Sequence, residues 1–295
     1  MVPALDEANT LATNNAGSKN TNQVITSNFM TPQGVAVTPK YIITSSYDHE
    51  YRGASILSII DRSTGKHLKN VILQGRPHVG GVAYEADKNL LWVCGSSGKE
   101  AALIAIKMDD IDSYDFAKSN NAINYTHVAL LPGIAKASTV AYRDGQLWVG
   151  FFSVTGDSTV QRFDVDKVLS GRNSIKNVSG GSLLGNDVRE QLSQQSIGKI
   201  QGFSFYKNLM YISQSYGSGD SEIYVYKIDS NKRRFTKNDA EAVIKMPSHL
   251  EQITIDGNRM YAIFESSARS YKTHEQTRIG RVVSFDVSKL PPLEK

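Results

Sequence analysis

The chain has 295 residues, of which 40% are hydrophobic and 21% charged, and its formal net charge is +4. This composition is typical of a globular protein, and no apolar run approaches the roughly 18 residues that a membrane-crossing helix needs. The basic residues are scattered, and the densest cluster, Lys232-Arg233-Arg234, stands between two expected strands, so nucleic-acid binding is not indicated. The single cysteine, Cys94, excludes an intrachain disulfide.

The N-terminal stretch over residues 8–22 is rich in Asn, Thr, Ala, Ser and Gly and has no periodicity. It predicts a disordered lead-in over residues 1–21, followed by a single domain over 22–295. There is no basic segment followed by an apolar one, so we expect that any signal peptide has been removed or was never present. Such a lead-in before an all-β domain is typical of exported Gram-positive proteins, and it predicts a secreted or cell-surface monomer.

The chain repeats a pattern in which a polar or small residue opens a short apolar strand, and a second apolar strand follows after a turn. The opening strands are Gln33-Gly34-Val35-Ala36-Val37, Gly80-Gly81-Val82-Ala83-Tyr84, Ser138-Thr139-Val140-Ala141-Tyr142, Gln201-Gly202-Phe203-Ser204-Phe205 and Glu251-Gln252-Ile253-Thr254-Ile255. The copies start roughly 47 to 63 residues apart, which is the period expected of propeller blades with some long loops. The repeat therefore predicts an all-β fold, a five-bladed β-propeller.

Further strands complete the predicted blades. A third strand with alternating apolar and polar residues follows each pair, the pattern of a half-buried strand. Fourth strands are expected in the first, second and fourth blades, at residues 67–73, 126–131 and 242–246. The fifth blade lacks one, so residues 23–29 are predicted to complete the last blade and close the ring, which would leave no open sheet edge. The third blade carries a long excursion between Asp166 and Gly198, with a helix expected over 186–193.

One face of such a ring gathers the loops that lead into the innermost strands and those that join second to third strands. These loops concentrate Tyr, Ser, Gly, Gln and charged residues, as a site for a small polar ligand requires. The candidate ligand-binding residues are Gln33, Tyr47, Asp48, His49, His78, Gln201, Tyr216, Glu251, Glu265 and Arg269. Tyr47 and Tyr216 occupy corresponding positions and would stack on the ligand, while Gln33, Gln201 and Glu251 would orient it. The alternative is that both glutamines only satisfy backbone groups lining the channel.

Motifs for catalysis are absent: the chain has no HExxH, P-loop, GxSxG or CxxC. The six histidines have no metal-binding spacing, so no metal and no cofactor is assigned. A metal held by His78, Glu251 and Asp48 from separate blades is the one arrangement that the topology would allow.

Two segments resemble the plant-type glutaminyl cyclotransferases, which are five-bladed propellers. One joins Pro32-Gln33-Gly34-Val35 to residues 55–66, and the other covers residues 250–262. The resemblance implies the fold, but the family's acidic proton-transfer residue would fall at Val79-Gly80-Gly81, where there is no carboxylate, so the activity is not carried over. Residues 34–95 also resemble uncharacterised secreted proteins of Gram-positive bacteria, through Tyr47-Asp48-His49 and Pro77-His78-Val79-Gly80-Gly81.

Three hypotheses remain open. The first is a binding module for a small polar ligand, a carbohydrate or an extracellular protein at the channel mouth. The second is a hydrolase or lyase, lactonase-like, in which His78 or His49 acts as acid or base with Glu251 or Asp48, with or without a metal. The third is a protein-binding scaffold that uses the excursion in the third blade. Propellers host all three functions, so the fold alone does not decide whether the protein is an enzyme.

Overall fold

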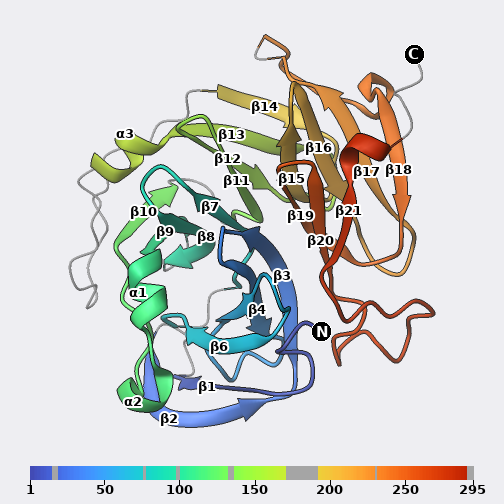
Figure 1. Ribbon diagram of the computed structural model, residues 1–295. Coiled ribbons are helices and arrows are strands. Elements are labelled where there is room, and N and C mark those ends of the chain that lie inside the picture. The colour runs from blue at the N-terminus through green and yellow to red at the C-terminus, as the bar shows by residue number, and fades with distance from the viewer. Residues whose placement is uncertain are drawn as a thin grey trace.

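The structure is a computed structural model that describes residues 1–14, 19–75, 78–97, 100–131, 136–170, 192–229 and 231–290. Five small antiparallel sheets are arranged as a five-bladed β-propeller, confirming the predicted fold class (Figure 1). In each sheet the first strand in the chain lies innermost, and each next strand pairs outward from it. Short hairpin turns make the first and second strands of each blade neighbours, whereas longer connections join the third to the fourth strand in blades two, three and four and the second to the third strand in blade five.

The blades contain the following strands, from the innermost outward. Blade one has β3 (Met30–Val37), β4 (Tyr41–Asp48), β5 (Ile56–Asp61) and β6 (His67–Ile72). Blade two has β7 (Val82–Glu85), β8 (Leu90–Ser97), β9 (Glu100–Lys107) and β10 (His127–Leu131). Blade three has β11 (Thr139–Arg143), β12 (Gln146–Phe151), β13 (Ser158–Asp164) and β14 (Leu192–Ser196). Blade four has β15 (Ile200–Tyr206), β16 (Leu209–Gln214), β17 (Ser221–Lys227) and β18 (Ala242–Met246). Blade five has β19 (Leu250–Asp256), β20 (Arg259–Phe264) and β21 (Val283–Asp286).

The antiparallel order gives the ring two different faces. One face carries the connections that lead into the innermost strands and the loops that join second to third strands. We call it the loop face. We call the other, with the turns between first and second strands, the hairpin face. Short helices occupy only connections: α1 (Met108–Ser113), α2 (Phe116–Ser119), α3 (Val165–Ser170), η1 (Lys237–Asp239) and η2 (Val287–Lys289). Within the described residues, no helix has both the length and the apolar composition to cross a bilayer.

Blade three has a fourth strand that the sequence analysis did not predict. Strand β14 pairs with β13 from Ser158–Ser196 to Arg162–Leu192 and lies inside the predicted excursion. Its sequence, Leu-Ser-Gln-Gln-Ser, is almost entirely polar, so it carries no apolar alternation by which a strand could be recognised. The last two residues of the helix predicted over 186–193 belong to this strand, and the rest of that segment lies outside the described residues.

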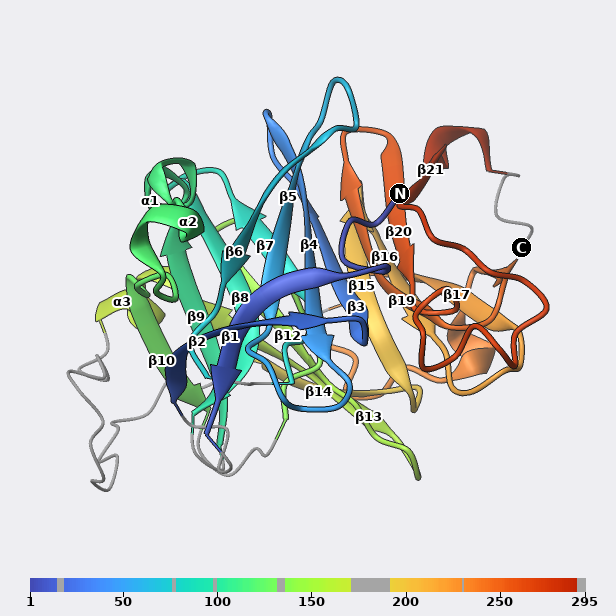
Figure 2. The same ribbon diagram turned by 90° about the horizontal axis from the view of Figure 1, so that it is seen from below.

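The ring does not close through the predicted N-terminal strand. Strand β2 (Asn20–Ser27) pairs with β1 (Ala8–Thr13), and these two form a separate sheet, while the described part of blade five keeps three strands. Figures 1 and 2 both show the β1–β2 pair outside blade one, alongside β6. The prediction was wrong because it treated residues 8–13 as unstructured, which left residues 23–29 without a nearby partner.

Residues 1–14 and 19–21, the described part of the segment predicted as a disordered lead-in, are ordered in the structure. Leu11 of β1 is buried against Met30, Ile56 and Ile72 of blade one. Val2 is also buried, and its backbone N–H donates to the Gly280 carbonyl over 2.8 Å. Low average hydrophobicity does not prevent a segment from ordering when its few apolar residues meet an existing core.

The junction between blades one and five is instead made by side chains. Val2 and Leu5 fill an apolar cluster between the two blades that includes Val35 and Ile263. At the hairpin face Arg62 forms an ion pair with Asp256. No strand is shared across this junction in the part of the chain that the structure describes.

Gln252 fills the centre of the ring. Its side chain starts from blade five, and Oε1 accepts the backbone N–H groups of Val35 and Val82, each over 2.9 Å. Nε2 donates to the carbonyls of Val82 and Val140, over 2.9 and 3.0 Å. One buried amide thus uses all of its hydrogen-bonding capacity and joins blades one, two and three to blade five.

The other blades leave room for this side chain by having small residues at the corresponding position. A Cβ added to Gly34 would lie 2.8 Å from Gln252 Oε1, and one added to Gly202 would lie 2.7 Å from Gln252 Cα. A Cβ on Gly81 would lie 3.1 Å from Gln252 Cδ. These glycines of the repeat are therefore needed for close approach to the ring centre.

We predict that Gln252→Met lowers the free energy of unfolding by at least about 4 kcal/mol, because methionine keeps the length of the side chain but leaves four buried backbone groups without partners, each costing roughly 1–3 kcal/mol. Urea denaturation at pH 7 measures the change. Gln201→Met is the matched control: Gln201 is partly exposed, and its side chain makes one long hydrogen bond, of 3.4 Å, within the described residues, so its loss should cost less than about 1 kcal/mol. Equal midpoints for the two variants would contradict the role assigned to Gln252.

Candidate functional site

Irregular pairing positions the predicted residues at the loop face. The register of the first two strands shifts at the start of blade one (Pro32/Gly34), blade four (Ile200/Gly202) and blade five (Leu250/Ile253). Such bulges redirect side chains at strand ends. The residues at these irregularities include Gln33, Gln201 and Glu251, three of the predicted ligand-binding residues.

A group of charged, polar and aromatic side chains, most of them buried or partly buried, lies at the loop face, mainly between blades one and five. We call it the loop-face cluster. Its members are Gln33, Tyr47, His49, His78, His249, Glu251, Glu265, Tyr271 and Glu275. It contains six of the ten predicted residues, in contact or in electrostatic interaction with one another.

His249 is the hub of this cluster. Its Nδ1 lies 3.2 Å from Glu265 Oε1, and its Nε2 lies 2.8 Å from Glu275 Oε1. The hydrogen bond to Glu265 raises the pKa of His249, and the one to Glu275 adds to the rise, while burial opposes it. Burial also opposes ionisation of Glu275, but hydrogen bonds from Ser248 and His249 lower its pKa overall. The two neighbouring glutamates therefore favour the protonated form of His249.

Glu251 stands beside this charged group and behaves differently. It is 4% exposed. Burial raises its pKa well above the usual value, and the interaction with Glu265 raises it further. Glu265 accepts from Gln33 Nε2 over 3.1 Å and lies 3.2 Å from His249 Nδ1. The surroundings of Glu251 therefore favour its protonated form.

Aromatic rings form the side of the cluster nearest blades one and two. The ring centres of Tyr47 and His78 are 4.1 Å apart, and Tyr47 Oη lies 3.1 Å from His49 Nδ1. Although His78 is exposed, the protein atoms around its ring lower its pKa to about 4, with Lys136 and His49 contributing. Tyr271 packs against His249 with a distance of 4.8 Å between ring centres. Burial raises the pKa of both tyrosines, which keeps their phenol groups protonated.

Four of the predicted residues take no part in this cluster. The Asp48 carboxylate accepts backbone N–H groups of Glu50, Arg52 and Gly53 over 2.9–3.1 Å, so it stabilises its own loop. The Arg269 guanidinium lies over the Phe29 ring at 4.9 Å. The other two residues, Gln201 and Tyr216, lie on blade four.

Blade four carries its own aromatic group on the loop face. Tyr216 is 57% exposed, and the Lys199 ammonium lies 4.6 Å from its ring centre. The Phe152 ring is the nearest aromatic partner, with 6.3 Å between ring centres. Tyr47 and Tyr216 thus occupy corresponding positions in the repeat, but Tyr47 is buried in the loop-face cluster and Tyr216 lies at the surface.

The sequence analysis did not select His249, Tyr271 or Glu275. His249 could have been found from the sequence, because pairing the strands on either side of the turn at Gly257 places His249 opposite Glu265. In the structure, the Glu265 N–H donates to the His249 carbonyl over 3.0 Å. Tyr271 and Glu275 come from the irregular connection after β20, whose path no periodicity predicts.

The metal site considered from the sequence is not assembled. Among the described residues, no three His, Cys, Asp or Glu side chains are grouped so that they could hold a metal ion. Of the three expected ligands, Asp48 is occupied by its own loop, and the ring of His78 packs on Tyr47.

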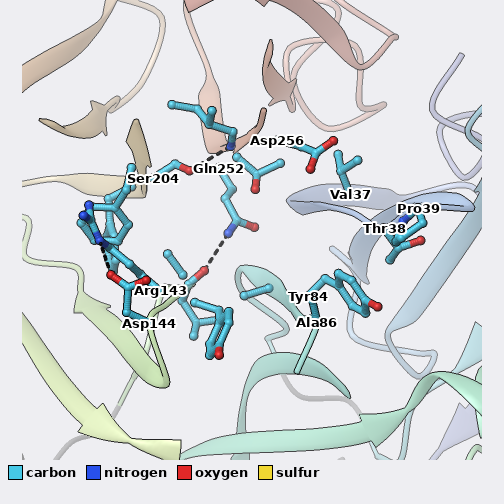
Figure 3. A pocket seen from close by; sticks show the side chains of 18 of the residues that line it. Val37, Thr38, Pro39, Tyr84, Ala86, Arg143, Asp144, Ser204, Gln252 and Asp256 are labelled. Carbon is cyan, nitrogen blue, oxygen red and sulfur yellow. Dashed lines mark hydrogen bonds and ion pairs between the residues drawn. The ribbon is translucent and has the colours of Figure 1, made fainter. Parts of the chain in front are cut away.

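The opposite face of the ring holds a pocket of about 490 Å³ that the sequence analysis did not predict (Figure 3). It is lined by residues of all five blades, among them Tyr84, Arg143, Ser204 and Asp256, and Gln252 forms its floor. Gln252 follows Glu251 directly in the chain, so the two faces meet at this dipeptide. The chemistry of the buried carboxyl groups thus lies on one face and the pocket on the other.

Comparison with known proteins locates no family: no protein-family model matches the chain, and no curated protein matches it in sequence. Among solved structures, a glutaminyl cyclase from Myxococcus xanthus is similar, with 13% identity over 81% of this chain and 88% of that chain and a TM-score of 0.49. A protein of unknown function from Bacteroides caccae has 13% identity over 95% and 90% of the two chains, with a TM-score of 0.49. A chain of a nidogen/laminin complex has 12% identity over 96% and 89%, with a TM-score of 0.47.

With identities of 12–13% and TM-scores below 0.5, these similarities assign no activity to this chain. Gram-positive origin and export stay predictions.

We predict that Glu251→Gln changes how stability depends on pH. When folding raises the pKa of a carboxyl group, the protonated group stabilises the folded protein. This contribution is complete at pH values below the pKa of the unfolded state, 4.5, and it is lost as the pH rises through the pKa of the folded state. The variant removes this loss, so its free energy of unfolding relative to wild type should increase from pH 4 to pH 8, by at least about 1 kcal/mol. Urea denaturation across this range measures the difference.

Glu50→Gln is the control for that experiment, because Glu50 lies on the same face, is exposed and pairs with Arg52 at the surface. Its stability should run parallel to wild type at every pH. If the Glu251→Gln curve is also parallel to wild type, Glu251 is not held neutral in the folded protein.

Proposed function

We propose that the loop-face cluster binds a small polar ligand rich in hydroxyl groups, of the size of a simple sugar. The observation that supports this most strongly is Glu251, whose side chain is only 4% exposed and whose pKa is raised by burial and by Glu265, so that its protonated form is favoured. A neutral carboxyl group can both donate to and accept from a hydroxyl group.

The surroundings of Glu251 suit such a ligand. The exposed His78 supplies a ring face on which the apolar face of a sugar can pack, while Tyr47 is buried behind it, and the Glu265 carboxyl group supplies an acceptor. The cluster contains three glutamates and neither a lysine nor an arginine, which disfavours acidic ligands. Sugars and other neutral polyols meet both conditions. A secreted or cell-surface location, predicted from the sequence, would expose the site to extracellular carbohydrate.

Acid–base catalysis is the second candidate function, and one observation favours it. Burial favours the protonated form of Glu251, which interacts with the neighbouring Glu265, and two carboxyl groups in different surroundings can divide the roles of acid and base. In a hydrolase, Glu251 would protonate the leaving group and Glu265 would activate water. The structure modifies the pairing expected from sequence, because Asp48 is occupied and His78, with its lowered pKa, stays neutral at pH 7.

Glu251→Ala should weaken saturable binding of a sugar at least about tenfold, because the hydrogen bond to the ligand is lost. Isothermal titration calorimetry with glucose, galactose, N-acetylglucosamine and their β-linked disaccharides measures the effect. Glu251→Gln should bind nearly as well as wild type, because a neutral amide replaces a neutral acid of the same shape. Glu50→Ala is the surface control. The proposal fails if wild type binds none of these sugars or if Glu251→Ala binds as tightly as wild type.

The same variants separate binding from catalysis. If the protein hydrolyses p-nitrophenyl glycosides, Glu251→Gln should lower kcat by roughly 10²–10⁴ with little change in sugar affinity, because an amide cannot transfer the proton. Turnover that is unchanged in Glu251→Gln would exclude Glu251 as the acid.

A further inference from the structure

The pocket on the hairpin face is separate from the loop-face cluster, because the Gln252 amide occupies the channel between them and its four hydrogen bonds are all made to backbone groups of the protein (Figure 3). A volume of about 490 Å³ is within the range of small-molecule sites. A ligand in this pocket would therefore bind independently of one at Glu251.

The lining of the pocket is partly apolar. Val37, Ala83, Ala141 and Ile255 contribute apolar side chains, whereas Val140 and Phe203 are fully buried in the packing between blades. Gln252, Thr254 and Ser204 are polar, and the Ser204 hydroxyl oxygen accepts the Ile255 N–H over 2.8 Å. The lining therefore offers an apolar surface to part of a ligand.

The rim of the pocket carries more positive than negative charge. Its charged residues are Arg62, Arg143, Lys207, Asp144 and Asp256. Arg62 is engaged, because it donates to the Thr38 carbonyl over 2.9 Å and pairs with Asp256.

Two cations of the rim keep unused hydrogen-bonding capacity. Arg143 Nε pairs with Asp144 over 3.1 Å, but its Nη1 is buried without a hydrogen-bond partner among the described residues. Lys207 is exposed, forms no ion pair within the described part of the chain, and lies 5.1 Å from the ring centre of Tyr206. Because Arg143 Nη1 is buried, an anionic group at the rim would pair with Lys207 and with the exposed part of the Arg143 guanidinium.

We propose that the hairpin-face pocket binds a small organic acid with an apolar body, whose carboxylate contacts Lys207 and Arg143 while its apolar part lies over the floor formed around Gln252. A carboxylate is favoured over a neutral group because the rim has one unmatched positive charge. The apolar part of the lining favours an aryl or alkyl acid over a small inorganic anion, which would leave that surface exposed to water.

The test is a titration of the full chain with phenylacetate and hexanoate, and with phenylacetamide and hexanamide as uncharged counterparts. Calorimetry gives the affinities, and backbone amide chemical shifts show where the acids bind. Both acids should bind saturably and shift amides of the pocket lining, and both amides should bind at least about tenfold more weakly, since hydrogen bonds to charged groups contribute roughly 1.5–3 kcal/mol. Lys207→Asn should weaken acid binding about tenfold.

The matched control is Lys199→Asn. Lys199 and Lys207 both have positive φ, 61° and 54°, where asparagine is well tolerated, and each ammonium lies over a tyrosine ring. Both variants remove one positive charge, but Lys199 lies on the loop face, so Lys199→Asn should bind the acids like wild type. The proposal is overturned if neither acid saturates the protein, if the shifts fall on the loop face, if the amides bind as well as the acids, or if the two lysine variants behave alike.

Discussion

The side chain of Gln252 is the interaction on which the rest of this ring depends. Four hydrogen bonds of 2.9–3.0 Å connect one amide from blade five to the innermost strands of blades one, two and three. Glycines at the corresponding positions of blades one, two and four let the strands come close enough for this contact. The ring centre has space for one such side chain, so the five copies of the repeat could not be identical at this position. The same amide divides the channel into two compartments, which explains how one small ring can hold two different kinds of site.

The two compartments have opposite physical character. On the loop face, ionisable groups lie together, and burial next to Glu265 raises the pKa of Glu251. On the hairpin face, apolar side chains line part of the pocket and the charges lie at the rim, where water screens them. The bulge at the start of β19 contains both Glu251 and Gln252. It therefore lies where one side chain joins the loop-face cluster and the next one fills the ring centre.

The fold could be predicted from sequence because each blade carries the same local pattern, a short apolar strand opened by a small or polar residue and followed by alternating strands. Features that depend on non-local packing could not. Strand β14 is polar and gains its identity only from pairing with β13. Strand β1 lacks a strong pattern, but Leu11 finds a core against blade one, and the pairing of β1 with β2 displaced the predicted ring closure.

The candidate site was predicted in part for a related reason. Residues that open the innermost strands, such as Gln33 and Glu251, share a position in the repeat and therefore converge. His249 could have been found from the hairpin register, whereas Tyr271 and Glu275 lie on an irregular connection. Gln252 was part of the quoted repeat, but its role depends on the absence of side chains at three glycines, which becomes visible only when the blades are placed around one centre.

The junction between blades one and five has a mechanical consequence. Within each sheet, strands are held by ladders of backbone hydrogen bonds, which resist shear because many must break together. Between blades five and one, the described contacts are an apolar cluster containing Val2 and Leu5, the Arg62–Asp256 ion pair, and single hydrogen bonds such as that between Gln33 and Glu265. Contacts of this kind can separate one after another. Tension applied along the chain would therefore open the ring at this junction first, turning a closed disc into an arc of blades.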